Sequence, residues 1–230
     1  MRIAIMQPYF FPYIGYFQLI HAVDTFVVYD DVNYIKRGWI NRNNILADGE
    51  PTLISLETSG ASQNKLISQV KVGDNRHKLL KTIKYRYSAA PYCDKVMPLI
   101  ERILGNEESN LATFLSAQLR EICRYLDVRI NWCTSSSLDK DVSLKGQDKI
   151  IAICRVLAAD QYVNPVGGRE LYQHEIFSKQ GIELSFLESR ISGYAQFQHK
   201  FVPSLSIIDV LMFNDRRNIH NFLDEYSLAA

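Results

Sequence analysis

Two adjacent carboxylates, Asp30 and Asp31, follow a strongly β-prone run and are the first candidates for chemistry in this sequence. Two carboxylates at the end of a strand can hold a divalent cation, or one of them can act as a general base. If the groups lie close together, their repulsion raises the pKa of one and favours the role of base. The alternative is a solvated polar loop whose carboxylates form ion pairs with neighbours.

A basic and amide-rich segment follows this doublet. Lys36, Arg37 and Arg42 place three positive charges within seven residues, and guanidinium groups match the geometry of phosphate oxygens. Asn41 and Asn43 add donors and acceptors suited to sugar hydroxyls or carbonyls. This combination predicts a binding site for an anionic, polar ligand, and a solvated polar loop with adjacent ion pairs is the alternative.

The same region is rich in aromatic residues. Of the chain's 26 aromatic residues (2 Trp, 13 Tyr and 11 Phe), ten lie between Tyr9 and Trp39. Aromatic rings supply flat stacking faces, and tyrosine adds a polar rim. The cluster predicts either a rigid structural corner or a wall against which a base or sugar ring stacks.

Glycines at two strand-to-helix connections are candidate phosphate sites. Gly15 lies at the start of a predicted helix, where backbone amides favour anions and a glycine allows close approach. Gly167 and Gly168 follow another predicted strand, and their amides can surround a phosphate. A plain turn is the alternative at the second place.

Further candidates are a histidine and several serines. His199 titrates near neutrality when unperturbed and can move a proton, although a lone histidine is more often structural or exposed. Ser204 or Ser206 can cap the helix that follows. The run 135–137 has no nucleophile-elbow pattern and is interpreted as a polar loop that can line a site.

The elements that must position these residues follow from local patterns. β-prone runs at 2–6 and 25–29 flank a helical run at 14–22, which predicts a βαβ unit and a parallel sheet. Other strands are predicted at 52–56, 131–134, 161–164 and 182–187, with a weak one near residue 70. Helices are predicted at 74–87, 92–104, 110–126, about 150–157, 170–180, 205–213 and 216–226.

These elements predict a single α/β domain over residues 1–230. We expect three layers, with a mostly parallel sheet, flanking helices and a helical insertion at about 74–127. Ligands of open α/β sheets bind beyond the carboxyl ends of the strands. Those ends are predicted at Gln7-Pro8, Asp30-Asp31, 134–136 and Asn164-Pro165.

Composition excludes several classes of protein. The 230 residues are 47% hydrophobic and 22% charged, which argues against a disordered chain or a coiled coil. The net charge of +1 gives no bulk attraction to nucleic acid or membranes. The four cysteines form no Cys-x-x-Cys pair, so no zinc site is expected. No signal peptide or membrane-spanning run is visible, which predicts a cytoplasmic location.

The motifs above resemble those of the WbqC-like protein family. The similar positions are Gln7-Pro8, Phe11-Pro12, Gly15-Tyr16, Asp30-Asp31-Val32, Lys36-Arg37, Trp39, Asn41-Arg42-Asn43, Gly167-Gly168, Tyr172, Tyr194-x-Gln196, Phe201-x-Pro203 and Leu205 to Asp209. One departure is Met6, because many members have histidine directly before Gln-Pro. No role of that histidine transfers to this chain.

The resemblance implies a part in O-antigen or other surface-polysaccharide biosynthesis. An acyl or aminoacyl group, such as glycyl, would be joined to the amine of a nucleotide-linked deoxyamino sugar. ATP with a divalent cation would activate the acid, or the acyl donor would arrive already activated. Catalytic candidates are Asp30, Asp31 and His199. Candidates for substrate binding are Gln7, Phe11, Gly15, Tyr16, Lys36, Arg37, Trp39, Asn41, Arg42, Asn43, Gly167, Gly168, Tyr172, Tyr194 and Gln196.

Two other functions stay open at this point. In a glycosyltransferase, Asp30 and Asp31 would form a metal-binding pair beside the sugar diphosphate. In a non-catalytic module of a polysaccharide-assembly complex, the same residues would bind a nucleotide sugar without turnover. The identity of the sugar, the acyl group and its donor, any metal requirement and a homo-oligomeric state are not determined by the sequence.

Overall fold

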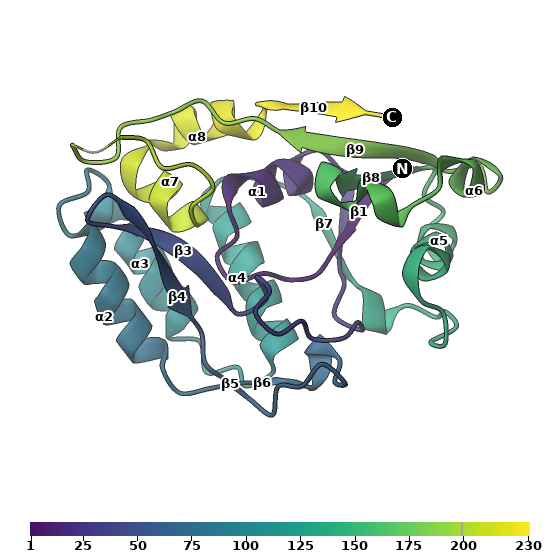
Figure 1. Cartoon of the computed structure of the whole chain (residues 1–230), viewed down its shortest axis with the longest axis horizontal. Coiled ribbons are helices and arrows are strands. Elements are labelled where there is room, and N and C mark those ends of the chain that lie inside the picture. Colours follow the sequence, from purple (N-terminus) through teal and green to yellow (C-terminus); the bar gives the residue numbers. More distant parts are fainter. Residues whose placement is uncertain (199) are drawn as a thin grey trace.

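A six-stranded sheet is the centre of the molecule in the computed structural model, which describes residues 1–198 and 200–230 (Figure 1). Its strand order is β10-β9-β8-β1-β2-β7, and only β10 runs antiparallel to its neighbour. The mostly parallel sheet predicted from the sequence is therefore confirmed. The strands are β1 (Arg2–Met6), β2 (Thr25–Val28), β7 (Asn131–Thr134), β8 (Gln161–Pro165), β9 (Glu183–Ser189) and β10 (Tyr226–Ala229).

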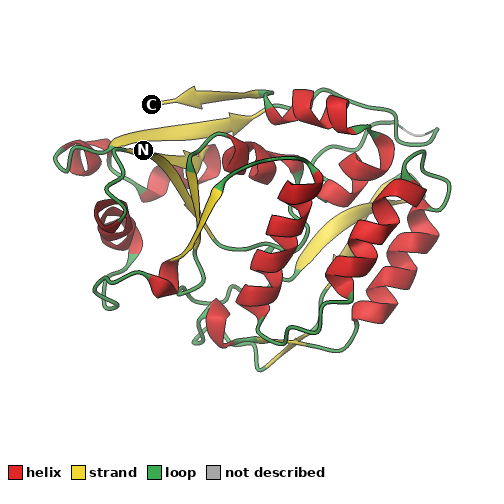
Figure 2. Ribbon diagram, turned by 180° about the vertical axis from the view of Figure 1, so that it is seen from behind, coloured by secondary structure: helices red, strands yellow, loops and turns green. Residues whose placement is uncertain are grey.

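Helices cover both faces of this sheet, which gives the three layers expected (Figures 1 and 2). On one face Ala4, Phe26 and Val28 pack with α1 (Ile14–His21), α4 (Leu111–Tyr125), α7 (Ile207–Phe213) and α8 (Arg216–Leu223). On the other face Ile5 and Val27 pack with α5 (Gly146–Val156) and α6 (His174–Ser178). Successive side chains of a strand point to opposite faces, so apolar strands buried on both sides contribute to both cores.

The segment between β2 and β7 adds a helical layer and a hairpin. Helix α3 (Cys93–Leu104) lies between α4 and α2 (Arg76–Tyr87), and α2 and α3 cover the hairpin of β3 (Arg42–Ala47) and β4 (Glu50–Ser55) (Figure 2). Small elements complete this segment: β5 (Thr58–Ser59), β6 (Lys71–Val72) and the 3-10 turn η1 (Ile67–Gln69).

The hairpin was only half predicted, as a strand at 52–56. Its first strand was missed because the asparagine-rich run through Asn44 favours a loop. Asp48 and Gly49 have φ values of 53° and 82°, as in the two-residue turn that the Asp-Gly dipeptide favours. That dipeptide was the signal that would have predicted both strands.

Two predictions about the C-terminal third were wrong. The helix expected at 170–180 is a 3-10 helix, η3 (Val166–Leu171), followed by the short α6. The chain is extended at Tyr172 between them, because the Tyr172 ring packs edge-on against Tyr162 and Phe177, with centroids 5.6 and 5.7 Å away. The helix expected at 216–226 ends at Leu223, and residues 226–229 form the edge strand β10.

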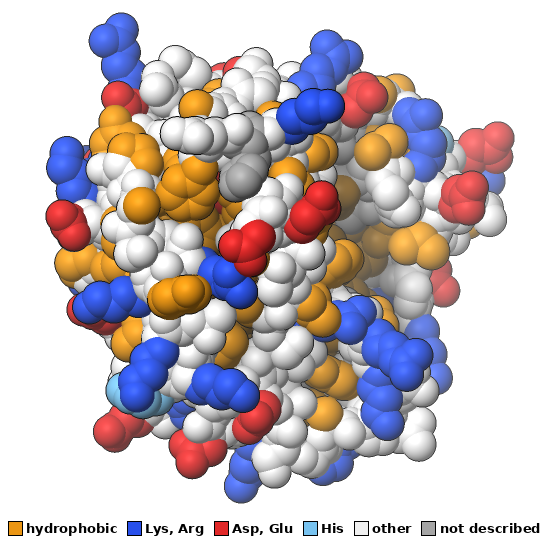
Figure 3. Space-filling model, turned by 60° about the vertical axis from the view of Figure 1, so that its left-hand side comes forward, with side chains coloured by type: hydrophobic (Ala, Val, Ile, Leu, Met, Phe, Trp, Pro, Cys, Tyr) orange, Lys and Arg blue, Asp and Glu red, His pale blue; other side chains and the backbone are white. Residues whose placement is uncertain are grey.

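No helix in the described part of the chain has the length and apolar character required to cross a membrane. Acidic and basic side chains are interspersed on the face shown in Figure 3, and hydrophobic side chains lie in its hollow. This mixture agrees with the net charge of +1.

Candidate functional site

Asp30 and Asp31 lie beyond the end of β2 but point to opposite faces of the sheet. Asp30 lines a cavity on the α4 side of the sheet, together with Val28. Asp31 lines a second cavity on the α5 side, the side of the sheet on which Val27 is buried. The chain turns here, since the Asp30 amide donates to the Val28 carbonyl at 3.1 Å, and the two carboxylates border different cavities. We call these spaces the Asp30 cavity and the Asp31 cavity.

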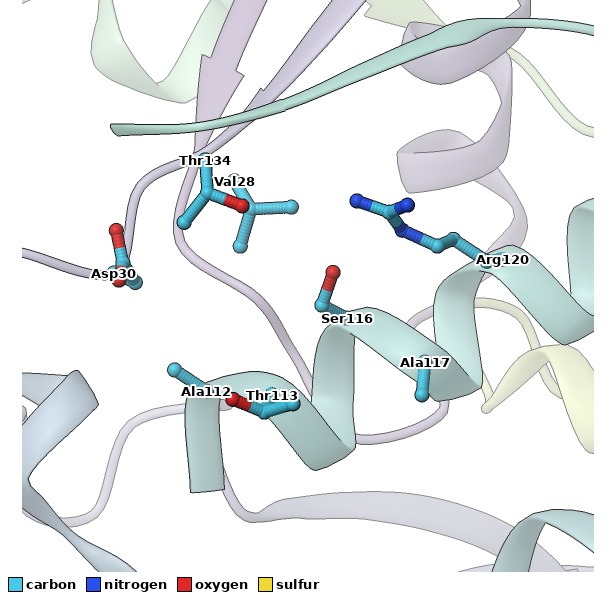
Figure 4. A pocket seen from close by; sticks show the side chains of 8 residues that line it. All are labelled: Val28, Asp30, Ala112, Thr113, Ser116, Ala117, Arg120 and Thr134. Atoms are coloured by element: carbon cyan, nitrogen blue, oxygen red, sulfur yellow. The ribbon is translucent and has the colours of Figure 1, made fainter. Parts of the chain in front are cut away.

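The Asp30 cavity lies between α4 and the carboxyl ends of β2 and β7 (Figure 4). Its volume is about 310 Å³, close to the lower end of the range for small-molecule sites. Short side chains on α4 leave the space open. Its lining residues are Val28, Asp30, Ala112, Thr113, Ser116, Ala117, Arg120 and Thr134.

The carboxylate of Asp30 is held in a fixed orientation. One oxygen accepts a hydrogen bond from the Ser136 backbone amide at 3.0 Å, and the other accepts one from the Ser136 hydroxyl at 2.6 Å. Asp30 is only 4% exposed, yet it borders the cavity. Each carboxylate oxygen can accept a second hydrogen bond, so a molecule in the cavity can donate a hydrogen bond to Asp30.

A cation stands at the other end of the same cavity. The Arg120 guanidinium points inward from α4, and the Ser116 hydroxyl lies between it and Asp30 (Figure 4). Arg120 also stacks over the Trp132 ring, with Cζ 5.2 Å from the centroid. A carboxylate and a guanidinium group therefore face one space.

Asp31 is neutralised by two lysines, of which Lys149 lines the second cavity and Lys140 does not. Its Oδ2 lies 2.9 Å from Lys140 Nζ and 3.0 Å from Lys149 Nζ. Burial alone would raise the pKa of Asp31, but the Ser135 hydroxyl and the two ammonium groups outweigh burial and lower it. Asp31 is therefore a salt-bridged anion, which suits a structural or ligand-positioning role better than that of a base.

The two carboxylates do not form the metal-binding pair considered from the sequence. They occupy different cavities, and Asp31 already pairs with two cations. Within residues 1–198 and 200–230, no three His, Cys, Asp or Glu side chains are grouped so as to hold a metal ion.

The aromatic residues divide between the core and a third space, the aromatic cavity. Phe10, Phe11 and Tyr16 are buried in the core, so the structural interpretation holds for them. The aromatic cavity has a volume of about 280 Å³ and is lined by Tyr9, Pro12, Tyr13, Trp39, Asn43 and Ser204. It offers a stacking surface, because Trp39 is 47% exposed.

The backbone around the aromatic cavity is held by buried polar groups. The Asn43 side-chain amide donates to the carbonyls of Phe10 and Phe11, at 3.3 and 2.7 Å. The Ser206 hydroxyl donates to the Phe11 carbonyl at 2.8 Å. Phe11 has a φ of 40°, a conformation that costs a non-glycine residue energy and needs such support. Asn43 therefore shapes the cavity as well as lining it.

The basic tract does not join the carboxylates in one cleft. Lys36 and Arg37 are exposed, and Arg42 donates to the carbonyls of Arg37 and Gly38. Among the described lining residues, none of these three borders the Asp30, Asp31 or aromatic cavity. The Asn41 side chain likewise bonds to the protein itself, since it accepts a hydrogen bond from the Tyr34 hydroxyl and donates one to the Leu56 carbonyl.

Several other expected binding residues contact the protein itself. A Cβ on Gly15 would lie 2.4 Å from a Tyr13 ring carbon, so that ring covers the start of α1. The Gln7 carbonyl accepts a hydrogen bond from the Tyr16 hydroxyl at 2.7 Å. Tyr172 packs in the aromatic group described above. His199 lies outside the described residues.

Tyr194 and Gln196 belong to a buried network around Asp209. Asp209 Oδ1 accepts from the Tyr194 hydroxyl at 2.7 Å and from the Gln196 amide at 2.6 Å, and Oδ2 accepts from the Tyr87 hydroxyl at 2.9 Å. Burial raises the pKa of Asp209, and the three hydrogen bonds oppose that rise. The network joins α2, α7 and the loop that contains Tyr194 and Gln196, so these residues support the fold.

Two explanations are open for the glycines Gly167 and Gly168: a side chain there would clash, or their amides bind phosphate. Alanine substitution tests the first explanation. A Cβ on Gly168 would lie 2.1 Å from Nδ2 of the buried Asn164, whereas no described atom lies within 4 Å of a Cβ on Gly167. We expect Gly168→Ala to lower stability by about 1–3 kcal/mol, as overpacking does, and Gly167→Ala to change it little. Urea unfolding of both variants measures the difference. Equal midpoints would show that the Asn164 side chain moves aside freely.

Sequence reasoning missed the groups that complete these cavities. Arg120, Lys140 and Lys149 come from elements distant in sequence from the doublet. One signal was available: Lys149 directly precedes the apolar run Ile150-Ile151 in a helix, which places a lysine next to a buried face.

The fold and its cavities define a three-layer α/β protein with polar sites at the carboxyl edge of its sheet. A model of the WbqC-like protein family matches residues 7–221, and the chain therefore belongs to the WbqC-like protein family. The uncharacterized protein Rv1507c of Mycobacterium tuberculosis is 28% identical over 218 residues, which cover 93% of each chain. No solved structure matches this chain.

Proposed function

We propose that this protein transfers an acyl or aminoacyl group, such as glycyl, to the amine of a nucleotide-linked deoxyamino sugar used in surface-polysaccharide biosynthesis. The family resemblance supplies the reaction class. The observation that carries the proposal is the Asp30 cavity, in which an oriented carboxylate and the Arg120 guanidinium face one space.

In the proposed reaction the sugar amine attacks the carbonyl carbon of the acyl donor. A carbon–nitrogen bond forms, the bond from the carbonyl carbon to the leaving group breaks, and the nitrogen loses one proton. Asp30 accepts that proton, which a positioned carboxylate can do in a general-base step. The leaving group departs with its electron pair and is protonated afterwards.

Arg120 is the cation suited to the substrate's diphosphate. Its guanidinium presents several donors in a fixed plane, which matches phosphate oxygens. This assignment replaces the basic tract at 36–42, because, among the described lining residues, Arg120 borders the Asp30 cavity and none of those side chains does. Ser116 and Thr134 add hydroxyl groups on the wall of the cavity.

Trp39 is the proposed stacking ring for the nucleotide base, because it is exposed and lines the aromatic cavity. We expect Trp39→Ala to weaken binding of the nucleotide sugar by about 5- to 150-fold, which corresponds to the usual ~1–3 kcal/mol of base–aromatic stacking. Isothermal titration calorimetry measures this loss. The matched control is Leu53→Ala, because Leu53 is equally exposed, at 49%, on the β3–β4 hairpin. Unchanged affinity in the Trp39 variant would remove the aromatic cavity from the proposal.

Product masses test the reaction itself. The chain is incubated with a panel of nucleotide-linked amino sugars and with either glycine plus ATP and Mg²⁺ or pre-activated acyl donors. Acyl transfer yields a heavier nucleotide sugar in which nucleotide and sugar remain joined. Release of free nucleotide from the sugar would support a glycosyltransferase instead. Saturable binding with no new product under any donor would support a binding module.

A further inference from the structure

The buried ion cluster beside the Asp31 cavity holds more positive than negative charge among the described residues. The side chains of Lys140 and Lys149 are 1% and 6% exposed, and the single carboxylate between them is that of Asp31, which is 11% exposed. Asp30 turns to the other face of the sheet, and Asp148 in the first turn of α5 is exposed. Burying an uncompensated charge is costly, so a second anion would balance the cluster.

Lys149 is positioned to meet such an anion. Its ammonium group lies 3.0 Å from Asp31 Oδ2 and donates to the Asp31 carbonyl at 2.6 Å, which uses two of its three protons. It also lies over the Tyr29 ring, 5.2 Å from the centroid. Both Lys149 and Tyr29 line the cavity. Among the described residues Lys149 has no third hydrogen-bond acceptor, so its third proton can bind an oxyanion in that space.

The N-terminus of α5 opens into the same cavity. Lys145, Gly146 and Lys149 line it together. Within the described chain, the N-cap residue Lys145 gives no side-chain hydrogen bond to the first-turn amides. No described atom lies within 4 Å of a Cβ on Gly146, so space is open at that helix end. Uncapped first-turn amides and the helix dipole favour a negatively charged group there.

We propose that the Asp31 cavity binds a phosphate group, held by Lys149 and the first-turn amides of α5. The volume of about 250 Å³ accommodates phosphate or a small phosphate monoester, and Val32, Leu66 and Leu144 form apolar walls beside it. This site lies across the sheet from the Asp30 cavity and goes beyond the acyl-transfer proposal, because it requires no acyl donor or amino sugar.

Titration with inorganic phosphate tests the site. We expect phosphate to raise the melting temperature of the wild-type chain saturably, since a ligand that binds only the native state stabilises it. Chloride at equal ionic strength controls for screening, and acetate separates phosphate from carboxylate binding. In Lys149→Met the remaining Lys140–Asp31 pair is balanced, and phosphate affinity falls at least tenfold. Lys81→Met, an exposed lysine on α2, keeps wild-type affinity.

A second variant keeps the test decisive if Lys149→Met does not fold. Gly146 has a φ of 52°, a conformation that aspartate tolerates better than most residues. Gly146→Asp places a carboxylate in the open space at the helix end, so phosphate binding is lost while both lysine–Asp31 ion pairs remain. Wild-type phosphate affinity in Gly146→Asp, or no saturable phosphate effect on the wild-type chain, would overturn the site. Acyl transfer is assayed separately and does not enter this result.

Discussion

Replacing Asp30 with Asn is expected to slow acyl transfer by about 10²–10⁴-fold, the usual contribution of a general base. The fold is expected to survive, because an amide can preserve both contacts to Ser136. Its oxygen accepts from the Ser136 backbone amide, and its nitrogen donates to the hydroxyl oxygen. Single-turnover rates measured by product mass, together with melting temperatures, separate lost chemistry from lost structure.

Two further variants make this result specific. Asp139→Asn removes an exposed carboxylate from the same polar loop and is expected to leave the rate unchanged. Ser136→Ala keeps the Asp30 carboxylate but removes one contact that orients it, so a smaller loss is expected. Full activity of Asp30→Asn with any amino sugar that the wild-type chain acylates would exclude Asp30 as the base.

The parallel sheet could be predicted because its strands are short, apolar runs separated by helical patterns. The runs at 2–6 and 161–164 carry β-branched or aromatic residues, and polar or proline residues mark their ends. Strand β10 could not be predicted in this way. Residues 226–229 have little β signal, and their conformation comes from pairing with β9, which is tertiary context.

The candidate site was harder to predict because sequence neighbours need not share a surface. Asp30 and Asp31 were expected to act together, but the chain turns directly after β2 and the two residues line different cavities. The groups that pair with them, Ser136 and Lys149, lie more than a hundred residues later. Similarity to a family motif also does not distinguish ligand-binding residues from structural ones. Tyr194 and Gln196 match the motif, yet both hydrogen-bond to the protein's own Asp209.

Asp209→Ala is expected to produce the largest loss of stability, about 2–5 kcal/mol in the free energy of unfolding. Three buried donors, from Tyr87, Tyr194 and Gln196, would lose their acceptor, and each unsatisfied group costs ~1–3 kcal/mol before the site relaxes. Urea unfolding at neutral pH measures the loss. The matched control is Asp94→Ala, because Asp94 also lies in the first turn of a helix but is exposed. Equal midpoints for the two variants would contradict a structural role for the network.

The pH dependence of stability in Asp209→Asn is a second test of the network. The direction of the expected change follows from the raised pKa of Asp209. A carboxyl whose pKa is higher in the folded state than in the unfolded state binds its proton more tightly when folded. Its stabilising contribution is complete below the unfolded-state pKa of about 3.9 and is lost as pH rises through the raised value. The Asn side chain cannot ionise, so this decline is absent from the variant. The stability deficit of Asp209→Asn relative to wild type should therefore shrink as pH rises from about 4 toward neutrality. A deficit that stays constant across that range would show that Asp209 has the same pKa in both states, which its complete burial argues against.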